Sequence, residues 1–161
     1  MLTKKKKSRG FSLIELVIVV VIIAIIAAIA VPKMSRGAAG ASDAALMQNV
    51  AQMRSAIDLF VTEHGGAYPS QTPLTFIDQL TKYSDVTGAT SATKTTTHIY
   101  GPYLKTLPPL PVGSLKGQSS LTYNAAGPGT GAFAWCYDGT SIYANLPATE
   151  KDIKDQPYNT Y

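Results

Sequence analysis

The chain has 161 residues and a formal net charge of +4, which together allow one small domain with a modestly basic balance. Five of its basic residues precede the long apolar segment: Lys4, Lys5, Lys6, Lys7 and Arg9. Without them, 14 − 5 = 9 basic residues face 10 acidic ones, so the rest of the chain carries about −1. This distribution argues against a basic nucleic-acid-binding face and favours a positive-inside signal that holds the N-terminus in the cytoplasm.

An apolar segment follows this leader. Every residue from Leu16 to Val31 is apolar, and between Phe11 and Val31 only Ser12 and Glu15 interrupt the run. A helix of this length reaches roughly 31 Å at about 1.5 Å per residue, which is close to the hydrocarbon thickness of a bilayer. The segment therefore predicts a transmembrane helix over residues 11–31.

Two other interpretations of this segment are an ordinary membrane anchor and a secretory signal peptide cut after the small residues Ala28 and Ala30. The second fits less well, because Glu15 is a costly residue in a hydrophobic region and the apolar run is long for a signal peptide.

The helix is expected to continue beyond the span as an amphipathic helix over residues 32–64. Pro32 removes one backbone hydrogen bond and clashes with the carbonyl of Ala28, which predicts a kink there. Gly65 and Gly66 then provide the left-handed conformation that ends a helix. Apolar residues and one histidine recur at spacings of three and four, which predicts a stripe that packs on a sheet: Leu46, Val50, Met53, Ile57, Phe60 and His64.

Residues 65–150 are expected to form an α+β head. Leu74 to Tyr83 predicts a second helix, and the threonine-rich stretch from Ser84 to Thr97 predicts a mobile loop. Alternation over 133–137 and 142–146, around Asp138-Gly139, predicts a hairpin, and 120–124 a third strand. The polar residues 151–161 predict a loosely ordered tail.

The stretch from Lys7 to Val19 reads Lys-Ser-Arg-Gly-Phe-Ser-Leu-Ile-Glu-Leu-Val-Ile-Val. It resembles the class III signal of type IV pilins and of the pseudopilins of type II secretion systems. The resemblance implies that prepilin peptidase cleaves between Gly10 and Phe11, methylates the new Phe11 amine and leaves residues 1–10 as a leader peptide. Glu15 is an ionisable group in a membrane segment, so we expect it to act in subunit assembly with the Phe11 amine.

A longer resemblance links the head to the major pseudopilin of type II secretion. It rests on Gly-Gly-Ala-Tyr-Pro, Tyr-Gly-Pro-Tyr-Leu-Lys-Thr-Leu-Pro and Ala-Trp-Cys-Tyr-Asp-Gly-Thr-Ser-Ile-Tyr-Ala-Asn, in that order between Gly65 and Asn145. Members of that family often hold a calcium ion in a loop. A calcium site is therefore possible here, but no residue-by-residue match identifies its ligands. Four residues could provide oxygen ligands: Asp138, Asn145, Asp152 and Asp155.

The sequence offers little for catalysis. His64 and His98 have no ligand-like neighbours, and the lone Cys136 allows neither an intrachain disulfide nor a cysteine metal site and reads as a buried thiol. The glycine-rich stretch 127–131 lacks the Lys-Ser or Lys-Thr of a phosphate loop and predicts a turn. We therefore expect a protein that is not an enzyme and that needs no cofactor for catalysis.

These observations predict an α+β, pilin-like fold, in which a long N-terminal helix with a transmembrane first half packs on a small antiparallel sheet. The resemblance implies a structural subunit of the bacterial inner membrane, with one membrane pass and a periplasmic head, that polymerises into a periplasmic filament for type II protein secretion. Implied partners are further copies of the chain, prepilin peptidase, minor pseudopilins and an inner-membrane assembly platform with its ATPase, and no nucleic acid directly. Alternatives are a type IV pilus pilin for adhesion, motility or DNA uptake, and a membrane-anchored binding or enzyme domain.

Overall fold

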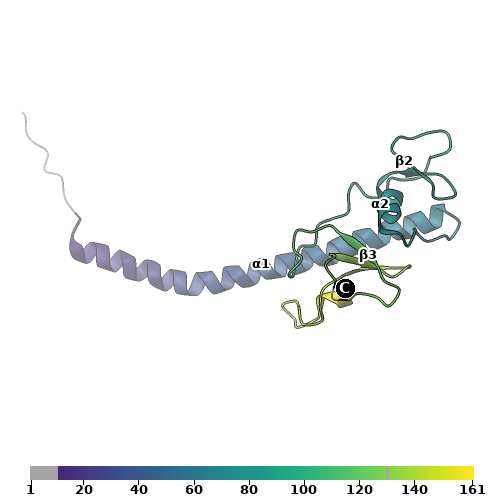
Figure 1. Ribbon diagram of the computed structural model, residues 1–161. Helices are drawn as coiled ribbons and strands as arrows, with labels where there is room; N and C mark the ends of the chain where they lie inside the picture. The colour runs from purple at the N-terminus through teal and green to yellow at the C-terminus, as the bar shows by residue number, and fades with distance from the viewer. Residues whose placement is uncertain (1–10, 130) are drawn as a thin grey trace, which may run out of the picture. The chain divides into compact units, whose positions relative to one another are not determined.

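The computed structural model describes residues 11–129 and 131–161, with the backbone alone at positions 31, 32 and 35. The leader predicted over residues 1–10 lies outside the described residues. The chain forms two compact units that divide between Ala38 and Ala39. The expectation of an α+β, pilin-like arrangement is confirmed: a long apolar N-terminal helix precedes a head of one further helix and two small sheets (Figure 1).

Helix α1 spans Leu13–Glu63, 51 residues in all. It continues through position 32, and the kink predicted at Pro32 stays a prediction. The helix ends beside the predicted His64, because Gly65 and Gly66 adopt φ values of 65° and 92°. The Gly66 amide then donates to the Val61 carbonyl oxygen at 2.8 Å, the bond that closes a Schellman-type helix end.

In the head, the predicted stripe of α1 forms one wall of the core. All six of its residues are buried, and the five apolar ones belong to the same core cluster as the buried residues of the sheet and of the loops that precede it. The largest fully buried side chains outside the stripe are Trp135, Tyr137, Phe76, Leu80, Leu110, Ile142 and Leu146. The spacing of three and four thus identified the buried face of a helix whose other faces meet solvent.

The main sheet has the order β3-β4-β5, with β3 at Leu121–Tyr123, β4 at Trp135–Tyr137 and β5 at Ile142–Ala144. Strands β4 and β5 form the predicted antiparallel hairpin, but β3 pairs with β4 in parallel. The prediction of an antiparallel sheet is therefore wrong for this pair. The physical reason is the connection over residues 124–134, which is long enough to carry the chain back to the end where β3 began.

The region between α1 and the main sheet is more regular than the sequence suggested. Helix α2 spans Pro73–Thr81, and β1 (Tyr83–Ser84) pairs with β2 (Thr90–Ser91) in the stretch predicted as a mobile loop. The Asp85 carboxylate organises the turn between them by accepting bonds from the Thr87 and Ala89 amides at 2.8 and 3.0 Å.

The C-terminal segment is not the loosely ordered tail that its polar composition suggested. Lys151 and Pro157 form an isolated antiparallel β-bridge, and the short 3-10 helix η1 spans Tyr158–Thr160. The buried Asp43 carboxylate on α1 accepts hydrogen bonds from the Ile153 amide at 3.1 Å and the Tyr158 hydroxyl at 2.8 Å. A buried carboxylate requires such donors, and here they come from residues more than a hundred positions away.

Candidate functional site

The N-terminal end of α1 carries the predicted assembly residues Phe11 and Glu15. Phe11 precedes the helix and is 84% exposed. The Ser12 amide donates to Glu15 Oε2 at 3.2 Å, and the Leu16 amide donates to the Ser12 carbonyl oxygen. Glu15 therefore also caps the helix, since a glutamate three residues after an N-cap serine satisfies an otherwise unpaired amide.

This capping role was missed at the sequence level. The signal was present as Ser12-Leu13-Ile14-Glu15, the Ser-x-x-Glu pattern of a capping box ahead of an apolar run. The bond holds one carboxylate oxygen, Oε2, near the start of the helix. Because a carboxylate has about four acceptor positions, the cap leaves capacity for a further cation or donor.

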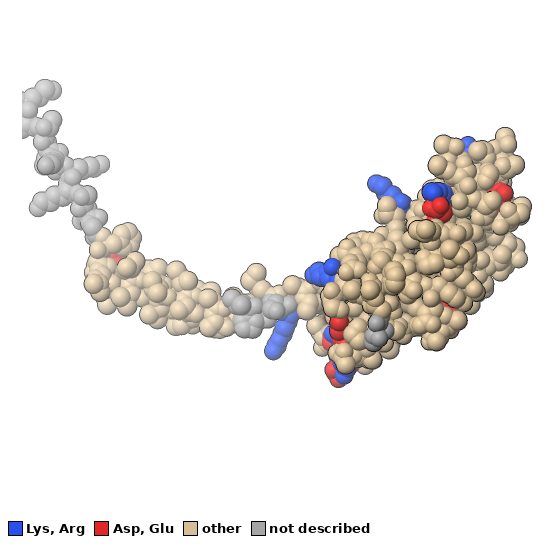
Figure 2. All heavy atoms as spheres, viewed as in Figure 1, with Lys and Arg blue, Asp and Glu red and all other residues tan. Residues whose placement is uncertain are grey.

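The first turns of α1 have no apolar partner in their own unit. The window Leu13–Ala30 has a mean hydropathy of 3.3, and none of it is buried. Figure 2 shows this stretch with little charged surface, in contrast to the head. By length and composition this helix can cross a membrane, and side chains this apolar need a non-aqueous environment.

Two of the predicted site residues cannot be placed. Gly10 lies outside the described residues, and only the backbone is described at Pro32. The structure thus brings Phe11 and Glu15 to one helix end, and the cleavage site itself stays a prediction.

The histidines and the cysteine of the head take structural positions. His64 is buried and stacks on Phe60 with ring centroids 3.8 Å apart. Its Nδ1 lies 2.8 Å from the Phe60 carbonyl oxygen and its Nε2 lies 3.1 Å from the hydroxyl of the fully buried Ser84. This pair ties the end of α1 to β1 and is closed to a substrate.

Cys136 is also fully buried. Burial raises the pKa of its thiol, and the nearby Asp138 carboxylate raises it further. A thiol in this environment stays protonated and unreactive.

The four residues considered for a metal are each engaged in local hydrogen bonds. Asp138 accepts from the Thr140 and Ser141 amides of its own turn, and Asp152 accepts from the Lys154 and Gln156 amides. Asn145 bonds to Gly129, and Asp155 pairs with Lys151. Within residues 11–129 and 131–161, no three His, Cys, Asp or Glu side chains gather closely enough to hold a metal ion.

The family comparison concerns the N-terminal segment. Residues 5–31 match the model of the prokaryotic N-terminal methylation motif. The chain thus carries the N-terminal segment of a type IV pilin-like prepilin. As such it is processed by prepilin peptidase and methylated, and it is a structural filament subunit of the kind of system that includes type IV pili and type II secretion, not an enzyme. No curated protein and no solved structure matches it.

The motif also gives the helix its location. An apolar helix of this length behind a prepilin N-terminus anchors the prepilin in the inner membrane, with the head outside the cytoplasm. The capping bond of Glu15 therefore lies at the membrane end of the subunit.

Proposed function

We propose that this prepilin is a pseudopilin of a type II secretion system. Prepilin peptidase cleaves it between Gly10 and Phe11 and methylates the Phe11 amine, leaving a mature chain of 161 − 10 = 151 residues. Mature subunits polymerise into a periplasmic filament that drives protein secretion, with minor pseudopilins and an inner-membrane platform whose ATPase supplies the energy.

The observation that supports polymerisation is the exposed apolar surface of the first part of α1. Leu13–Ala30 has no buried residue, so its whole circumference needs an apolar environment from outside its own unit. The bilayer provides that environment before assembly. In a filament, the same helices from neighbouring copies provide it by packing against one another, so that one surface serves both states.

Glu15 supplies specificity in this environment. A carboxylate near the centre of a membrane helix costs about 2.5–3.5 kcal/mol on insertion scales, and less near the interface. Away from water in the filament, it requires a cation. Cleavage creates one in the methylated Phe11 amine, and the amine of an adjacent subunit then pairs with Glu15 and sets the register of docking.

The leader explains why cleavage precedes assembly. Lys4 to Lys7 and Arg9 hold the N-terminus in the cytoplasm, and each basic side chain costs about 2.5–3.5 kcal/mol at the bilayer centre. A subunit that leaves the membrane for a periplasmic filament must draw its N-terminus into the apolar layer. Removing the leader removes five of these costs and leaves one amine, which has a carboxylate partner.

The choice of the secretion branch rests on the head. The three stretches that resemble the major pseudopilin form the turn after α1, the connection after β2 and the β4–β5 hairpin. A type IV pilus pilin shares the N-terminal chemistry. Deleting the gene and comparing secreted proteins with surface pili separates the two: we expect loss of secreted proteins with surface pili unchanged.

The decisive test of assembly uses two substitutions of Glu15. Glu15→Leu removes both the cap and the charge, whereas Glu15→Gln keeps an acceptor for the Ser12 amide and removes only the charge. Both variants should be inserted and cut, giving the mature mass, yet form no filaments when produced with their assembly partners. Removing one partner of a buried pair costs about 3–5 kcal/mol.

Filaments of Glu15→Gln in normal number would show that the cap, and not the charge, is what assembly needs. An uncut precursor would instead place Glu15 in the recognition site of the peptidase. The precursor variant Gly10→Trp provides the reference for an uncut chain in the same mass measurement.

A further inference from the structure

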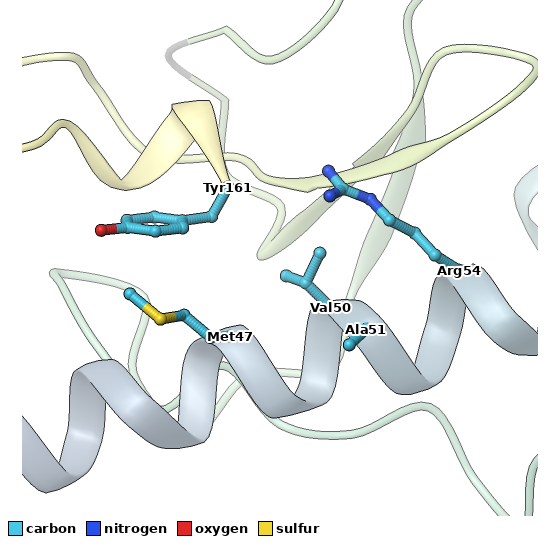
Figure 3. A pocket seen from close by; sticks show the side chains of 5 residues that line it. All are labelled: Met47, Val50, Ala51, Arg54 and Tyr161. Atoms are coloured by element: carbon cyan, nitrogen blue, oxygen red, sulfur yellow. The ribbon is translucent and has the colours of Figure 1, made fainter.

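A groove in the head runs along α1 beside Tyr161. Figure 3 shows Met47, Val50, Ala51 and Arg54 of α1 and the Tyr161 ring around it. The groove holds about 260 Å³. Four of its five lining side chains are apolar or aromatic, and the fifth is a cation. An occupant that fits this groove therefore brings an apolar side chain with an anionic group close by.

Arg54 is fixed in the groove by neutral groups. Its Nη2 donates to the Ile142 carbonyl oxygen of β5 at 3.0 Å, and its guanidinium lies 5.1 Å from the ring centre of Tyr143. Its Nε is buried without a hydrogen-bond partner among the described residues, and neither ion pair in that part of the chain includes Arg54. A cation fixed in this way favours a carboxylate from a partner.

The turn between β1 and β2 carries an apolar side chain beside a carboxylate. Val86 is 66% exposed in this turn, and Asp85 precedes it. Asp85 Oδ1 accepts hydrogen bonds from the Thr87 amide, the Thr87 hydroxyl and the Ala89 amide. These bonds, that of the Thr87 hydroxyl above all, lower the pKa of Asp85, so the carboxyl is ionised at neutral pH. Since all three bonds engage Oδ1, the other oxygen has capacity to accept from a partner.

Further hydrogen bonds fix the backbone of this turn. The Asp85 amide donates to the Ala89 carbonyl oxygen at 3.0 Å, and the Gly88 amide donates to the Asp85 carbonyl oxygen at 3.0 Å. The buried Gln79 side chain of α2 donates to the Gly88 carbonyl oxygen at 2.9 Å. The turn therefore presents Val86 and the Asp85 carboxylate in one arrangement, so that little conformational entropy is lost when they bind.

Two other acidic residues of the described head precede a large exposed apolar residue, and neither presents the same combination. Asp152, before Ile153, is buried, and both of its carboxylate oxygens already accept hydrogen bonds. Asp58, before Leu59, lies on α1, where consecutive side chains point in different directions. Of the three, the Asp85–Val86 turn is the one that matches the groove.

The groove and the turn are different surfaces of the head. The groove follows residues 47–54 of α1, whereas the turn lies near the end of α1, with Gly88 beside the Phe60 ring. Figure 1 shows β2 toward that end of the head. A contact between two different surfaces of identical copies is heterologous, because each copy offers its groove to one neighbour and its turn to another. Such contacts build an open helical array when the rotation between copies does not close a ring.

We propose that the groove binds the β1–β2 turn of a second copy of this chain, with Val86 on the apolar surface and the Asp85 carboxylate paired with Arg54. This inference rests on the proposed polymerisation and assigns to the head a contact of its own. It involves residues 39–161 alone, so it does not depend on how the head is placed relative to the apolar segment. Val86 provides apolar burial, and the ion pair sets the direction in which the turn enters the groove.

Disulfide cross-linking tests the contact directly. The full-length chain with both Ala51→Cys and Val86→Cys is produced with its assembly partners, and the filaments are oxidised. Because each copy then has one cysteine in its groove and one on its turn, the heterologous contact predicts a ladder of covalent dimers, trimers and longer products. Either substitution alone should give monomers. The native Cys136 is fully buried and does not compete.

The matched control replaces Val86→Cys by Leu74→Cys, a position on α2 that is 78% exposed and lies outside the turn. This chain should form filaments but no ladder. Filaments without the 51–86 ladder, or with as much of the 51–74 product, mean that the groove has a different occupant and overturn the inference while polymerisation stands. A wild-type chain that makes no filaments removes the proposed function, and this inference fails with it.

A second test removes the apolar side chain of the turn. Val86→Ser should reduce filament number about tenfold, because serine leaves the apolar surface of the groove uncovered. Leu74→Ser, the matched change outside the turn, should leave filament number unaltered. Both positions are exposed, so neither change should alter the unfolding temperature of the subunit, which is measured alongside. Normal assembly of Val86→Ser overturns the contact.

A double-mutant cycle tests the ion pair. Arg54→Gln removes the cation, and Asp85→Asn removes the negative charge but keeps an acceptor for the amides of the turn. Each variant should reduce filament number severalfold. The double variant should lose no more than the worse single variant, since the same ion pair is lost in all three. Losses that multiply in the double variant would show that the two charges act independently and would overturn the pairing.

Discussion

The two units of this prepilin use one kind of element, an α-helix, under opposite conditions. From Leu13 to Ala30 the helix is apolar on every side apart from Glu15 and buries nothing within its unit. In the head, the same helix α1 is apolar along one stripe, and that stripe is buried against the sheet. The comparison shows that periodicity, and not helix length or hydrophobicity alone, determines whether a helix finds its partners within its own chain or in its surroundings.

Two carboxylates on α1 also differ in whether their partners lie within the same chain. Asp43 is buried in the head, where the Ile153 amide and the Tyr158 hydroxyl satisfy it. Glu15 is exposed and accepts a bond from the Ser12 amide at its own helix end. The first carboxylate fastens the chain to itself, and the second keeps capacity for a partner from another subunit.

The largest expected effect is a loss of head stability that arises from substitutions in its core and not from substitutions in the apolar segment Leu13–Ala30. In the fragment of residues 39–161, which we expect to be soluble, Phe60→Ala should lower the free energy of unfolding by about 3–5 kcal/mol. Phe60 is 2% exposed and stacks on His64. Leu59→Ala, at a neighbouring position that is 54% exposed, should change it by less than about 0.5 kcal/mol. Denaturant unfolding measures both.

A change in the span completes the comparison. Ile22→Ala in the full chain should leave the unfolding of the head unchanged, because Ile22 has no contact within a folded core. An equal loss of head stability from Ile22→Ala and Phe60→Ala would show that the two units do not differ in this way.

A smaller effect is expected from Asp43, the carboxylate that fastens the C-terminal segment. Asp43→Ala should cost the head fragment about 2–3 kcal/mol, since hydrogen bonds to charged groups contribute about 1.5–3 kcal/mol each and do not add fully. Tyr158→Phe removes one of its two bonds and should cost less.

The double variant of Asp43 and Tyr158 measures their coupling. Asp58→Asn, an exposed aspartate on the same helix, is the control and should be silent in the isolated head. Additive losses from Asp43→Ala and Tyr158→Phe would mean that the carboxylate and the hydroxyl act independently.

The sequence predicted those parts of the fold that depend on local pattern. The stripe from Leu46 to His64, the end of α1 at Gly65-Gly66 and the β4–β5 hairpin follow from periodicity and turn chemistry, and the structure contains them. The parallel pairing of β3 and the fastening of the C-terminal segment depend on contacts between distant residues. No local pattern around Leu121 or Ile153 encodes which strand or which carboxylate it meets.

The candidate site divides in the same way. The order of Gly10, Phe11 and Glu15 could be recognised from the sequence, and so could the capping pattern that was overlooked. The groove at Arg54 could not, because its outer wall is Tyr161, more than a hundred residues along the chain. Its position follows from how the C-terminal segment packs on α1.

The smallest expected effect is on the pH dependence of head stability, through the hydrogen bond between Tyr161 and Asp152. The Tyr161 hydroxyl donates to Asp152 Oδ2 at 2.5 Å, and this bond, aided by the Gln156 and Lys154 amides and opposed by burial, lowers the pKa of Asp152. A carboxyl whose pKa is lower in the folded state stabilises the fold above the unfolded value of about 3.9. That stabilisation is lost as pH falls through the folded pKa, so the window lies below about pH 4.

The same bond acts on its donor in the opposite sense. It raises the pKa of Tyr161 to about 12, with burial adding to the shift, so the contribution of the hydroxyl is complete below about pH 10 and is lost as pH rises through 12. Tyr161→Phe removes the hydrogen bond and with it both pH-dependent contributions to stability, the acidic one and the alkaline one. The variant should therefore differ from the wild-type head in unfolding midpoint at neutral pH, and the difference should shrink toward both extremes. Carboxyl titration by NMR should show the pKa of Asp152 rising in Tyr161→Phe, and an unshifted Asp152 would assign its low pKa to the Gln156 and Lys154 amides alone. In that case Tyr161 would be positioned by packing against α1, and the wall of the groove would not respond to pH.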